Sequence, residues 1–384
     1  MSEAPPHVTD VVLEDLRARV RATRRVAVPP AAGWERGTDA DYLTALLTSW
    51  AEDYDWRPHE ERVRGLPWVR TATGGAVRSV HRRSSRSGAV PVVLLHGWPD
   101  SVLRFERVLP LLEDLHVVIP ALPGYPFAET WTGRPASTSV MADAVAGVME
   151  ELGYERYVVS GGDVGSSVAE GLAVRYPGRV GALHLTDVPY RHMFTVDEAE
   201  FSEPERAYLR AGRRWQGTEA AYALEQSTKP GTLAVGLGDS PAGLAAWVVE
   251  KLRSWSDCGG NVESVFPRED LLTWVTAYWV SGAIGTSFTP YAEQAEPVGR
   301  VDVPTAFTIF PHDLVTAPRE FGERFFDVRA WDERPDGGHF GAWERAEASQ
   351  RGCAWRSPCC RTDRCGTASA APPKEGLATC RRST

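Results

Sequence analysis

Short apolar runs alternate with helical segments through the first half of this chain, and few folds accommodate that alternation. The runs are rich in Val, Leu and Ile, which is typical of strands buried on both faces of a parallel sheet. They cover residues 90–95, 116–119, 157–160 and 182–186. Residues 138–152 have the pattern of a helix with a Ser or Thr cap and a Gly stop. Together these segments predict an α/β fold with a mostly parallel, doubly wound sheet flanked by helices.

The sequence outside these runs divides the chain into five parts. The first part should form amphipathic helices at 11–24 and 42–54, which need a larger surface to pack on. The third part is helical and aromatic without a strong strand signal, so we expect an inserted cap over the carboxyl ends of the strands. Strand signatures resume in the fourth part, at 303–310 and 325–331. The parts are an N-terminal helical region (1–60), the first part of the core (61–189), the cap (190–294), the second part of the core (295–348) and a divergent tail (349–384).

The tail differs from the rest of the chain in composition. It is rich in Arg, Cys, Ser and Pro and lacks apolar periodicity, so we expect it to be disordered and unpacked. Five of the six cysteines of the chain fall in its last 32 residues. Their spacing lacks paired C-x-x-C units and partner histidines, so we expect no metal site.

Size and charge limit the partners of this chain. Its 384 residues suit one large α/β domain with an inserted subdomain. A net charge of -9 without a basic stripe argues against a nucleic-acid partner. No run of about 18 apolar residues is present, which argues against a membrane span. The polar start at 1–10 is unlike a signal peptide. We therefore expect a cytoplasmic protein, and a homodimer stays open as its assembly.

The sequence Gly-Gly-Asp-Val-Gly at residues 161–165 follows one predicted strand and precedes a helical segment. Its glycines permit a tight turn that lifts Asp163 above the sheet, as in a nucleophile elbow. A serine that attacked a saturated carbon would be trapped as an ether, whereas an Asp ester can be hydrolysed at its own carbonyl. The motif thus indicates a substrate attacked at an alkyl carbon, such as an epoxide or a haloalkane. A helix cap is the alternative role for this residue.

A nucleophilic aspartate needs a base, an acid that orients the base, and an oxyanion hole. In hydrolases with this elbow the chain order is nucleophile, acid and histidine. Asp163, Asp313 and His339 follow that order. The oxyanion donors should be the backbone amides of Trp98, in the turn after a strand, and of Val164. Three other histidines should have packing or surface roles: His96, His184 and His312.

Four motifs occur in a specific order along the chain. They are His96-Gly97-Trp98-Pro99-Asp100-Ser101, Leu122-Pro123-Gly124-Tyr125, Gly161-Gly162-Asp163 and Gly337-Gly338-His339-Phe340. Together they resemble the microsomal-type epoxide hydrolases of the α/β-hydrolase superfamily. The stretch from Glu14 to Trp56 is similar to the N-terminal region of that family, which wraps around the core. The resemblance runs from about residue 11 to about residue 347 and implies the α/β-hydrolase fold.

The resemblance implies an epoxide hydrolase that needs no cofactor or metal and converts a small apolar epoxide and water into a vicinal diol. In that family two cap tyrosines hold and protonate the epoxide oxygen, and by similarity these are Tyr222 and Tyr291. Tyr208 and Tyr278 are weaker candidates. A phenol with a pKa of about 10 can donate a proton to an alkoxide without being ionised at neutral pH. Detoxification or aromatic hydrocarbon catabolism would be a fitting role.

Some features depart from the family pattern. The acid is Asp313, where the family often has Glu, and Val164 stands where a Trp is often found. Relatives continue after the histidine into a helix that packs on the sheet, whereas residues 345–350 run into the tail. Exposing the surface under that helix would cost about 25 cal/mol per Å², so we expect a fragile protein. A haloalkane dehalogenase and a catalytically decayed member of the family remain alternative functions.

Overall fold

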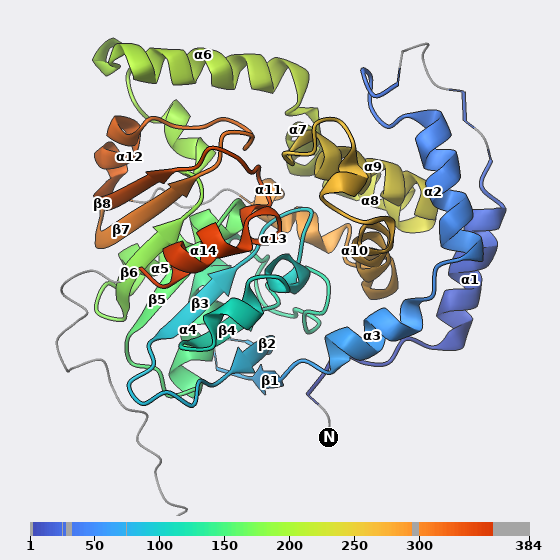
Figure 1. Cartoon of the computed structure of the whole chain (residues 1–384), viewed down its shortest axis with the longest axis horizontal. Coiled ribbons are helices and arrows are strands. Elements are labelled where there is room, and N and C mark those ends of the chain that lie inside the picture. The colour runs from blue at the N-terminus through green and yellow to red at the C-terminus, as the bar shows by residue number, and fades with distance from the viewer. Residues whose placement is uncertain (1–2, 25, 28–32, 74, 294–298, 356–384) are drawn as a thin grey trace, which may run out of the picture.

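Within the part of the chain that the structure describes, eight strands form a single sheet in the computed structural model (Figure 1). The described part is residues 3–355 without 25, 28–32, 74 and 294–298. The strand order is β1-β2-β4-β3-β5-β6-β7-β8, and β2 is antiparallel to β1 and β4 while the other neighbours are parallel. The expected mostly parallel sheet is therefore confirmed. The strands are β1 (Trp68–Thr71), β2 (Val77–Arg82), β3 (Pro91–Leu95), β4 (His116–Pro120), β5 (Tyr157–Gly161), β6 (Val180–Leu185), β7 (Val301–Ile309) and β8 (Phe326–Glu333).

Helices cover both faces of the sheet, which explains the continuous apolar runs in its central strands. Every residue of β3, β5 and β6 is buried. In Figure 1, α13 and α14 lie in front of the sheet, and α4 and α5 lie behind it. The predicted helix at 138–152 is present, but its N-cap is Ser137, one residue before the expected start. These helices are α4 (Thr138–Glu151), α5 (Val164–Arg175), α12 (Arg319–Phe325), α13 (Gly341–Glu344) and α14 (Ala346–Cys353).

In its described residues, the chain between β6 and β7 contains helices and connecting loops but no strand. It lies over the carboxyl ends of the strands, and α6 extends across the top of the molecule in Figure 1. Its α-helices are α6 (Glu203–Thr218), α7 (Ala221–Thr228), α8 (Pro230–Asp239), α9 (Pro241–Ser254), α10 (Arg268–Ser281) and α11 (Thr289–Ala292). The same segment contains the short 3₁₀ helices η3 (Tyr190–Phe194), η4 (Glu198–Glu200), η5 (Val262–Ser264) and η6 (Thr286–Phe288). Two more, η1 (Val102–Phe105) and η2 (Leu109–Leu112), lie between β3 and β4.

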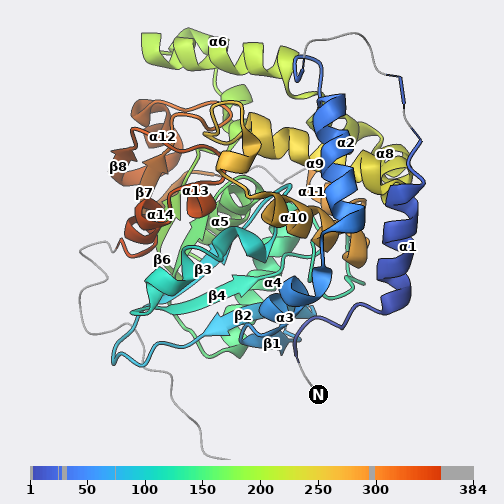
Figure 2. The same ribbon diagram turned by 45° about the vertical axis from the view of Figure 1, so that its right-hand side comes forward.

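The N-terminal helices pack beside the cap helices, as Figure 2 shows for α1 and α2. The indole Nε1 of Trp50 donates to the hydroxyl of Thr276 at 3.0 Å, and the Tyr54 hydroxyl lies 3.0 Å from that of Thr273. Both threonines belong to α10, so the N-terminal region braces the cap from outside. Its helices are α1 (Asp10–Arg21), α2 (Ala40–Glu52) and α3 (Trp56–Arg64).

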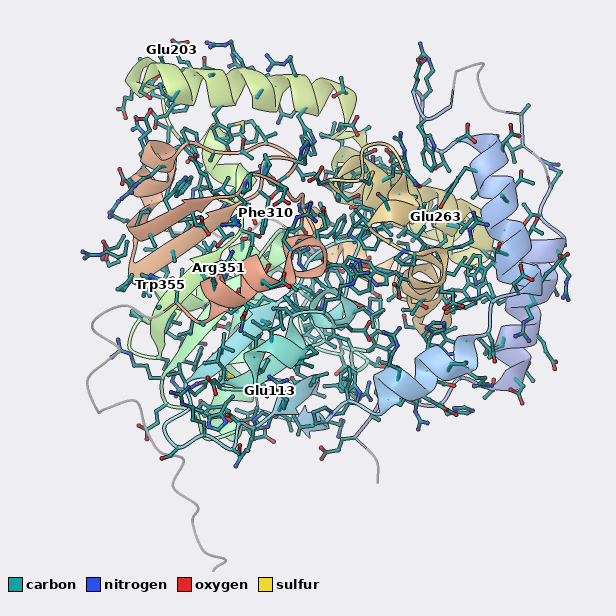
Figure 3. All side chains as sticks on the ribbon, in the orientation of Figure 1. Glu113, Glu203, Glu263, Phe310, Arg351 and Trp355 are labelled. Atoms are coloured by element: carbon teal, nitrogen blue, oxygen red, sulfur yellow. The ribbon has the colours of Figure 1, made fainter. Side chains whose placement is uncertain are left out.

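The expected start of the disordered tail, residue 349, is wrong. Residues 346–353 form α14, which packs on the sheet, and Cys353 is buried. Figure 3 places Arg351 and Trp355 at the end of this helix, beside the strands. The chain therefore keeps a helix after the histidine, and the argument for a fragile protein loses its basis. Apolar periodicity failed as a signal because Gly352, rather than a large apolar residue, makes the close contact with the sheet. The remainder of the predicted tail, residues 356–384, lies outside the described residues.

Two further observations concern the described residues only. No single helix among them is long and apolar enough to cross a membrane, and the bent pair α8 and α9, at 114°, meets the length and composition criteria only when its two helices are taken together. Among the same residues, no group of three or more His, Cys, Asp or Glu side chains is arranged to hold a metal ion.

Candidate active site

Asp163 stands on a sharp turn between β5 and α5. Its backbone angles, φ 58° and ψ -129°, are sterically unfavourable for a residue with a Cβ and cost about 1–3 kcal/mol. Gly165 is required beside it, because a Cβ there would lie 2.3 Å from the backbone oxygen of Leu95. The Asp163 side chain makes no capping hydrogen bond, although the residue occupies the N-cap position of α5. The helix-cap alternative is therefore not supported.

The carboxylate of Asp163 lies between a backbone amide and the imidazole of His339. The Trp98 amide donates to Asp163 Oδ1 at 2.8 Å, and His339 Nε2 is 3.5 Å from Asp163 Oδ2. On the other side of the ring, His339 Nδ1 is 2.7 Å from Asp313 Oδ1. The predicted nucleophile, base and acid thus lie together, with the side chains of His339, Asp313 and Asp163 only 1%, 5% and 8% exposed.

The loop that carries His339 is held close to the cap. The His339 amide donates to the backbone oxygen of Trp255 at 2.8 Å. A Cβ on the preceding Gly338 would lie 2.5 Å from that same oxygen, so only glycine fits there. The Arg104 guanidinium, buried and paired with Asp100, donates to the backbone oxygen of His339 at 2.6 Å. The histidine is therefore fixed from both sides of its backbone.

Opposite charges favour the ionised forms of Asp163 and His339. Burial by itself would raise the pKa of Asp163, but the His339 hydrogen bond and charge, together with the Trp98 and Val164 amides, bring it below the ordinary value. Burial would lower the pKa of His339, but the Asp313 and Asp163 carboxylates raise it to about 10. At neutral pH the resting site therefore contains a carboxylate nucleophile and an imidazolium.

Tyr222 on α7 and Tyr291 on α11 face the same region. The ring of Tyr222 stacks on Trp98 with centroids 5.3 Å apart, and Tyr291 lies 6.2 Å from Trp98 and 6.0 Å from Tyr222. The two phenol hydroxyls lie close enough to affect each other's pKa. Burial, and then the Asp163 charge, raise the pKa of both phenols well above 10. Both tyrosines are thus neutral hydrogen-bond donors at neutral pH.

The structure places the weaker candidates in other contacts. Tyr278 donates its hydroxyl to the backbone oxygen of Asp100 at 3.0 Å, and Tyr208 packs on Phe321 with ring centroids 5.0 Å apart. His96 Nε2 accepts from the Leu122 amide at 3.2 Å. His312 lies on the surface, where its Nε2 is 3.4 Å from an oxygen of Asp257. None of these groups hydrogen-bonds to Asp163 within the described residues.

Asp187 is a residue of this site that our sequence analysis missed. Its Oδ1 accepts the Asp163 amide at 2.9 Å and the Ser166 hydroxyl at 2.6 Å, so it ties the elbow to the end of β6. Burial, and then the charge of Asp313, raise its pKa to about 7. The signal was present in the sequence, because Asp187 directly follows a predicted strand, at the sheet edge where α/β sites lie.

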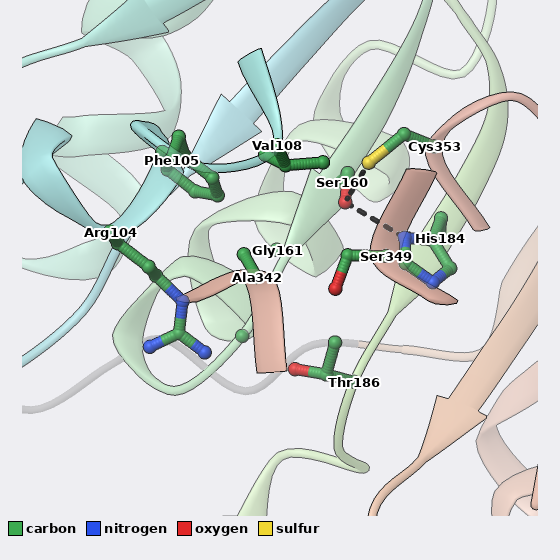
Figure 4. Close-up of a pocket in the computed structure, with 11 residues that line it drawn as sticks. Arg104, Phe105, Val108, Ser160, Gly161, His184, Thr186, Ala342, Ser349 and Cys353 are labelled. Atoms are coloured by element: carbon green, nitrogen blue, oxygen red, sulfur yellow. Dashed lines mark hydrogen bonds between the residues drawn. The ribbon is translucent and has the colours of Figure 1, made fainter. Parts of the chain in front are cut away.

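A second polar cluster lies beneath the elbow, in the small cavity of Figure 4. His184 Nδ1 is 2.8 Å from the Ser160 hydroxyl, and the Cys353 thiol donates to that hydroxyl at 3.5 Å. Burial raises the pKa of the thiol to about 11, which keeps it protonated and unreactive. The cavity volume is about 20 Å³, enough for one water molecule. This cluster packs α14 on the sheet and is separate from the Asp163 site.

Comparison with known proteins identifies the family and the fold of this chain. The family model described as "Epoxide hydrolase N terminus" matches residues 1–105, and the one described as "alpha/beta hydrolase fold" matches residues 90–237. A Stigmatella aurantiaca (strain DW4/3-1) protein named "Putative epoxide hydrolase" is 32% identical over 88% of this chain and 80% of its own length.

Two further relatives cover most of the chain. "Epoxide hydrolase 1" of Sus scrofa is 27% identical over 88% of this chain and 84% of its own length. The solved structure of Aspergillus niger epoxide hydrolase superposes with a TM-score of 0.79 at 28% identity, covering 90% of this chain and 93% of that one. With its α/β-hydrolase fold and an N-terminal region of the epoxide hydrolase type, this chain belongs to the microsomal-type epoxide hydrolases and is an enzyme that hydrolyses epoxides.

Proposed function

We propose that the enzyme opens its epoxide through a covalent ester on Asp163. Oδ2 of Asp163 bonds to one epoxide carbon, the ring C–O bond breaks, and its electron pair passes to the epoxide oxygen. That oxygen takes a proton from the hydroxyl of Tyr222 or Tyr291. The tyrosine regains its proton from the His339 imidazolium, which becomes a stronger acid once Asp163 no longer carries a charge. The intermediate is a hydroxyalkyl ester beside a neutral histidine.

Hydrolysis of the ester then restores the resting site. His339, oriented by Asp313, takes a proton from a water molecule, and the hydroxide adds to the carbonyl carbon of Asp163. The Trp98 and Val164 amides stabilise the oxyanion that forms there. Collapse breaks the ester bond, and the departing alkoxide takes the remaining hydroxyl proton to give the vicinal diol. Asp163 is again a carboxylate, His339 is again protonated, and no cofactor or metal has taken part.

One observation carries this proposal: the two oxygens of Asp163 have different partners. Oδ1 accepts the Trp98 amide at 2.8 Å, where an oxyanion would form, while Oδ2 faces His339 at 3.5 Å. With Oδ1 held where the oxyanion would form, Oδ2 is the oxygen that remains to attack the epoxide carbon. The neutral phenols of Tyr222 and Tyr291 supply the proton donors that an epoxide oxygen requires.

A single-turnover experiment tests the mechanism. Excess enzyme is mixed with styrene oxide in H₂¹⁸O, and the diol and the peptide that contains Asp163 are analysed by mass spectrometry. We expect unlabelled diol and one ¹⁸O atom in Asp163, because the diol oxygen comes from the carboxylate and water replaces it. Labelled diol with unlabelled Asp163 would mean direct attack by water. Asp163→Ala is the control and should give no diol.

The same assay distinguishes the alternative functions. A haloalkane dehalogenase would release halide from 1-chlorohexane, whereas the proposed enzyme should release none while it produces diol from styrene oxide. A decayed member of the family would yield neither product. We propose apolar epoxides as substrates, because aromatic rings of both the core and the cap surround the phenols: Trp98 of the core and Trp215 and Trp255 of the cap all contact Tyr222.

A further inference from the structure

Only two side chains of α7 are buried, Tyr222 and Gln226. They are four residues apart, so they lie on the same face of the helix, about 6 Å apart along its axis. That face is turned toward the active site, because the ring of Tyr222 stacks on Trp98, whose amide holds the nucleophile. Gln226 therefore lies next to Tyr222 on the face of α7 that is turned toward the active site.

The amide of Gln226 is buried but has no protein partner. The residue is 0% exposed, and neither its Nε2 nor its Oε1 has a hydrogen-bond partner among the described residues. A buried donor and acceptor left unpaired are unfavourable for folding, and such groups in native proteins usually have a functional explanation. An apolar side chain of similar size would avoid this penalty. The position therefore carries an amide for a reason other than stability.

Other polar groups near the nucleophile share this property. The indole Nε1 of Trp98 and the hydroxyl of Tyr125 are also buried without a hydrogen-bond partner. Tyr125 lies close enough to Asp163 for that charge to contribute to its raised pKa, after the larger effects of burial and of Tyr278. The region between the cap and the core therefore contains several unpaired polar groups. A ligand with its own hydrogen-bonding group would satisfy them.

We propose that Gln226 is a specificity-determining residue that binds a neutral hydrogen-bonding substituent of the substrate, such as a hydroxyl, ester or amide, about one helical turn along α7 from the phenol that binds the epoxide oxygen. The inference rests on the proposed function and deepens it: the substrate has an apolar body with one polar group. A neutral substituent fits because the amide carries no charge. The Lys251 ammonium, 5.3 Å from the centroid of the Tyr222 ring, is already paired with Glu250 at 2.6 Å.

Two substrates of equal heavy-atom count test the inference. In 4,5-epoxypentan-1-ol a hydroxyl stands where 1,2-epoxyhexane has a methyl group. We expect wild-type kcat/KM to favour the epoxy alcohol by about 10-fold or more. Gln226→Leu should lose about 10-fold on the epoxy alcohol, mainly through KM, and change by less than about 3-fold on epoxyhexane. Because Leu removes two unpaired polar atoms, the thermal midpoint of this variant should be equal to or above that of the wild type.

The control on the same helix is Leu224→Ala, since Leu224 is 63% exposed and should leave both activities unchanged. An equal loss on both substrates in Gln226→Leu would overturn the inference, because it would mean that the amide positions Tyr222 rather than the substrate. No change on either substrate would overturn it too. A wild-type enzyme that forms no diol from epoxyhexane would instead overturn the proposed function itself. The two failures are therefore distinguishable.

Discussion

Asp163 shows how much a single residue depends on distant parts of the chain. Its backbone is strained, yet its amide is held by Asp187 and its carboxylate by the Trp98 amide. His339 completes the set from the loop after β8. Each partner follows a different strand of the sheet. Strain at this position is stable because several independent contacts oppose its release.

The charge on Asp163 should control the protonation of His339. In the resting enzyme two carboxylates raise the pKa of His339 to about 10. Replacing Asp163 by Ala removes one of them, so we expect the pKa of His339 to fall below the wild-type value. An NMR titration of the His339 ring protons measures this directly. Asp15→Ala, at an exposed position of α1, is the matched control; an unchanged pKa in Asp163→Ala would contradict the prediction.

The raised pKa of His339 also makes the stability of the folded protein depend on pH. The pKa of His339 is higher in the folded protein than the ordinary 6.5, so its protonated form stabilises the fold. This contribution is complete below about pH 6.5 and is lost as the pH rises through about 10. We expect the difference in unfolding free energy between wild type and Asp163→Ala to shrink over that window. Urea unfolding at a series of pH values provides the measurement.

Among the elements, α14 differs most from what the sequence predicted, because part of it was expected to be disordered. It packs on the sheet without a row of large apolar residues, through the close approach of Gly352 to His184. His184 cannot move away easily, because Ser160 and Thr308 hold its two ring nitrogens at 2.8 and 3.0 Å. The helix is therefore seated by shape and by a polar cluster, which hydrophobic periodicity does not detect.

A methyl group at Gly352 should loosen this helix. A Cβ there would lie 2.0 Å from His184 Nε2, so we expect Gly352→Ala to lower the unfolding free energy by about 1–3 kcal/mol. Gly217→Ala in α6, where nothing lies within 4 Å, should instead be neutral or stabilise by about 0.5–1 kcal/mol. Chemical denaturation of both variants gives the comparison. Equal stability of wild type and Gly352→Ala would show that α14 does not need this contact.

At the scale of the whole molecule, the N-terminal region, the cap and the core form one assembly around Asp163. Trp50, from α2, is buried against the cap and bonds to Thr276 on α10. On its inner side α10 reaches the core, where its Tyr278 donates to the backbone oxygen of Asp100. The cap helix α10 is thus held between the N-terminal region and the turn that supplies the Trp98 amide.

Removing the outer contact should weaken the whole assembly. We expect Trp50→Ala to cost about 3–5 kcal/mol, because a large buried side chain and its hydrogen bond are both lost. Val11→Ala is the control, since Val11 is 73% exposed and its loss should cost less than about 0.5 kcal/mol. Thermal melts monitored by circular dichroism provide the measurement. A melt of Trp50→Ala that matches the control would mean that the N-terminal region does not brace the cap.

Much of the fold was predictable because it depends on local patterns. The predicted strands and the helix at 138–152 follow from periodicity and from Gly, Ser and Thr at their ends, which act over a few residues. Asp163, Asp313 and His339 could be chosen because each follows the end of a strand and because they occur in the expected order along the chain. Asp187 stands at such an end as well, but only its bond to the Asp163 amide distinguishes it from an ordinary loop aspartate.

The sequence by itself determined the α/β alternation, the aspartate elbow and the residue types of the site, because backbone geometry and near neighbours set these features. Only the tertiary structure decided which groups meet. The Trp98 amide and Asp163 are 65 positions apart, and Arg104 and His339 are 235 apart. Such pairs depend on the strand order and on packing between layers, which no short pattern encodes. For the same reason, the burial of Gln226 beside Tyr222 became visible only in the folded protein.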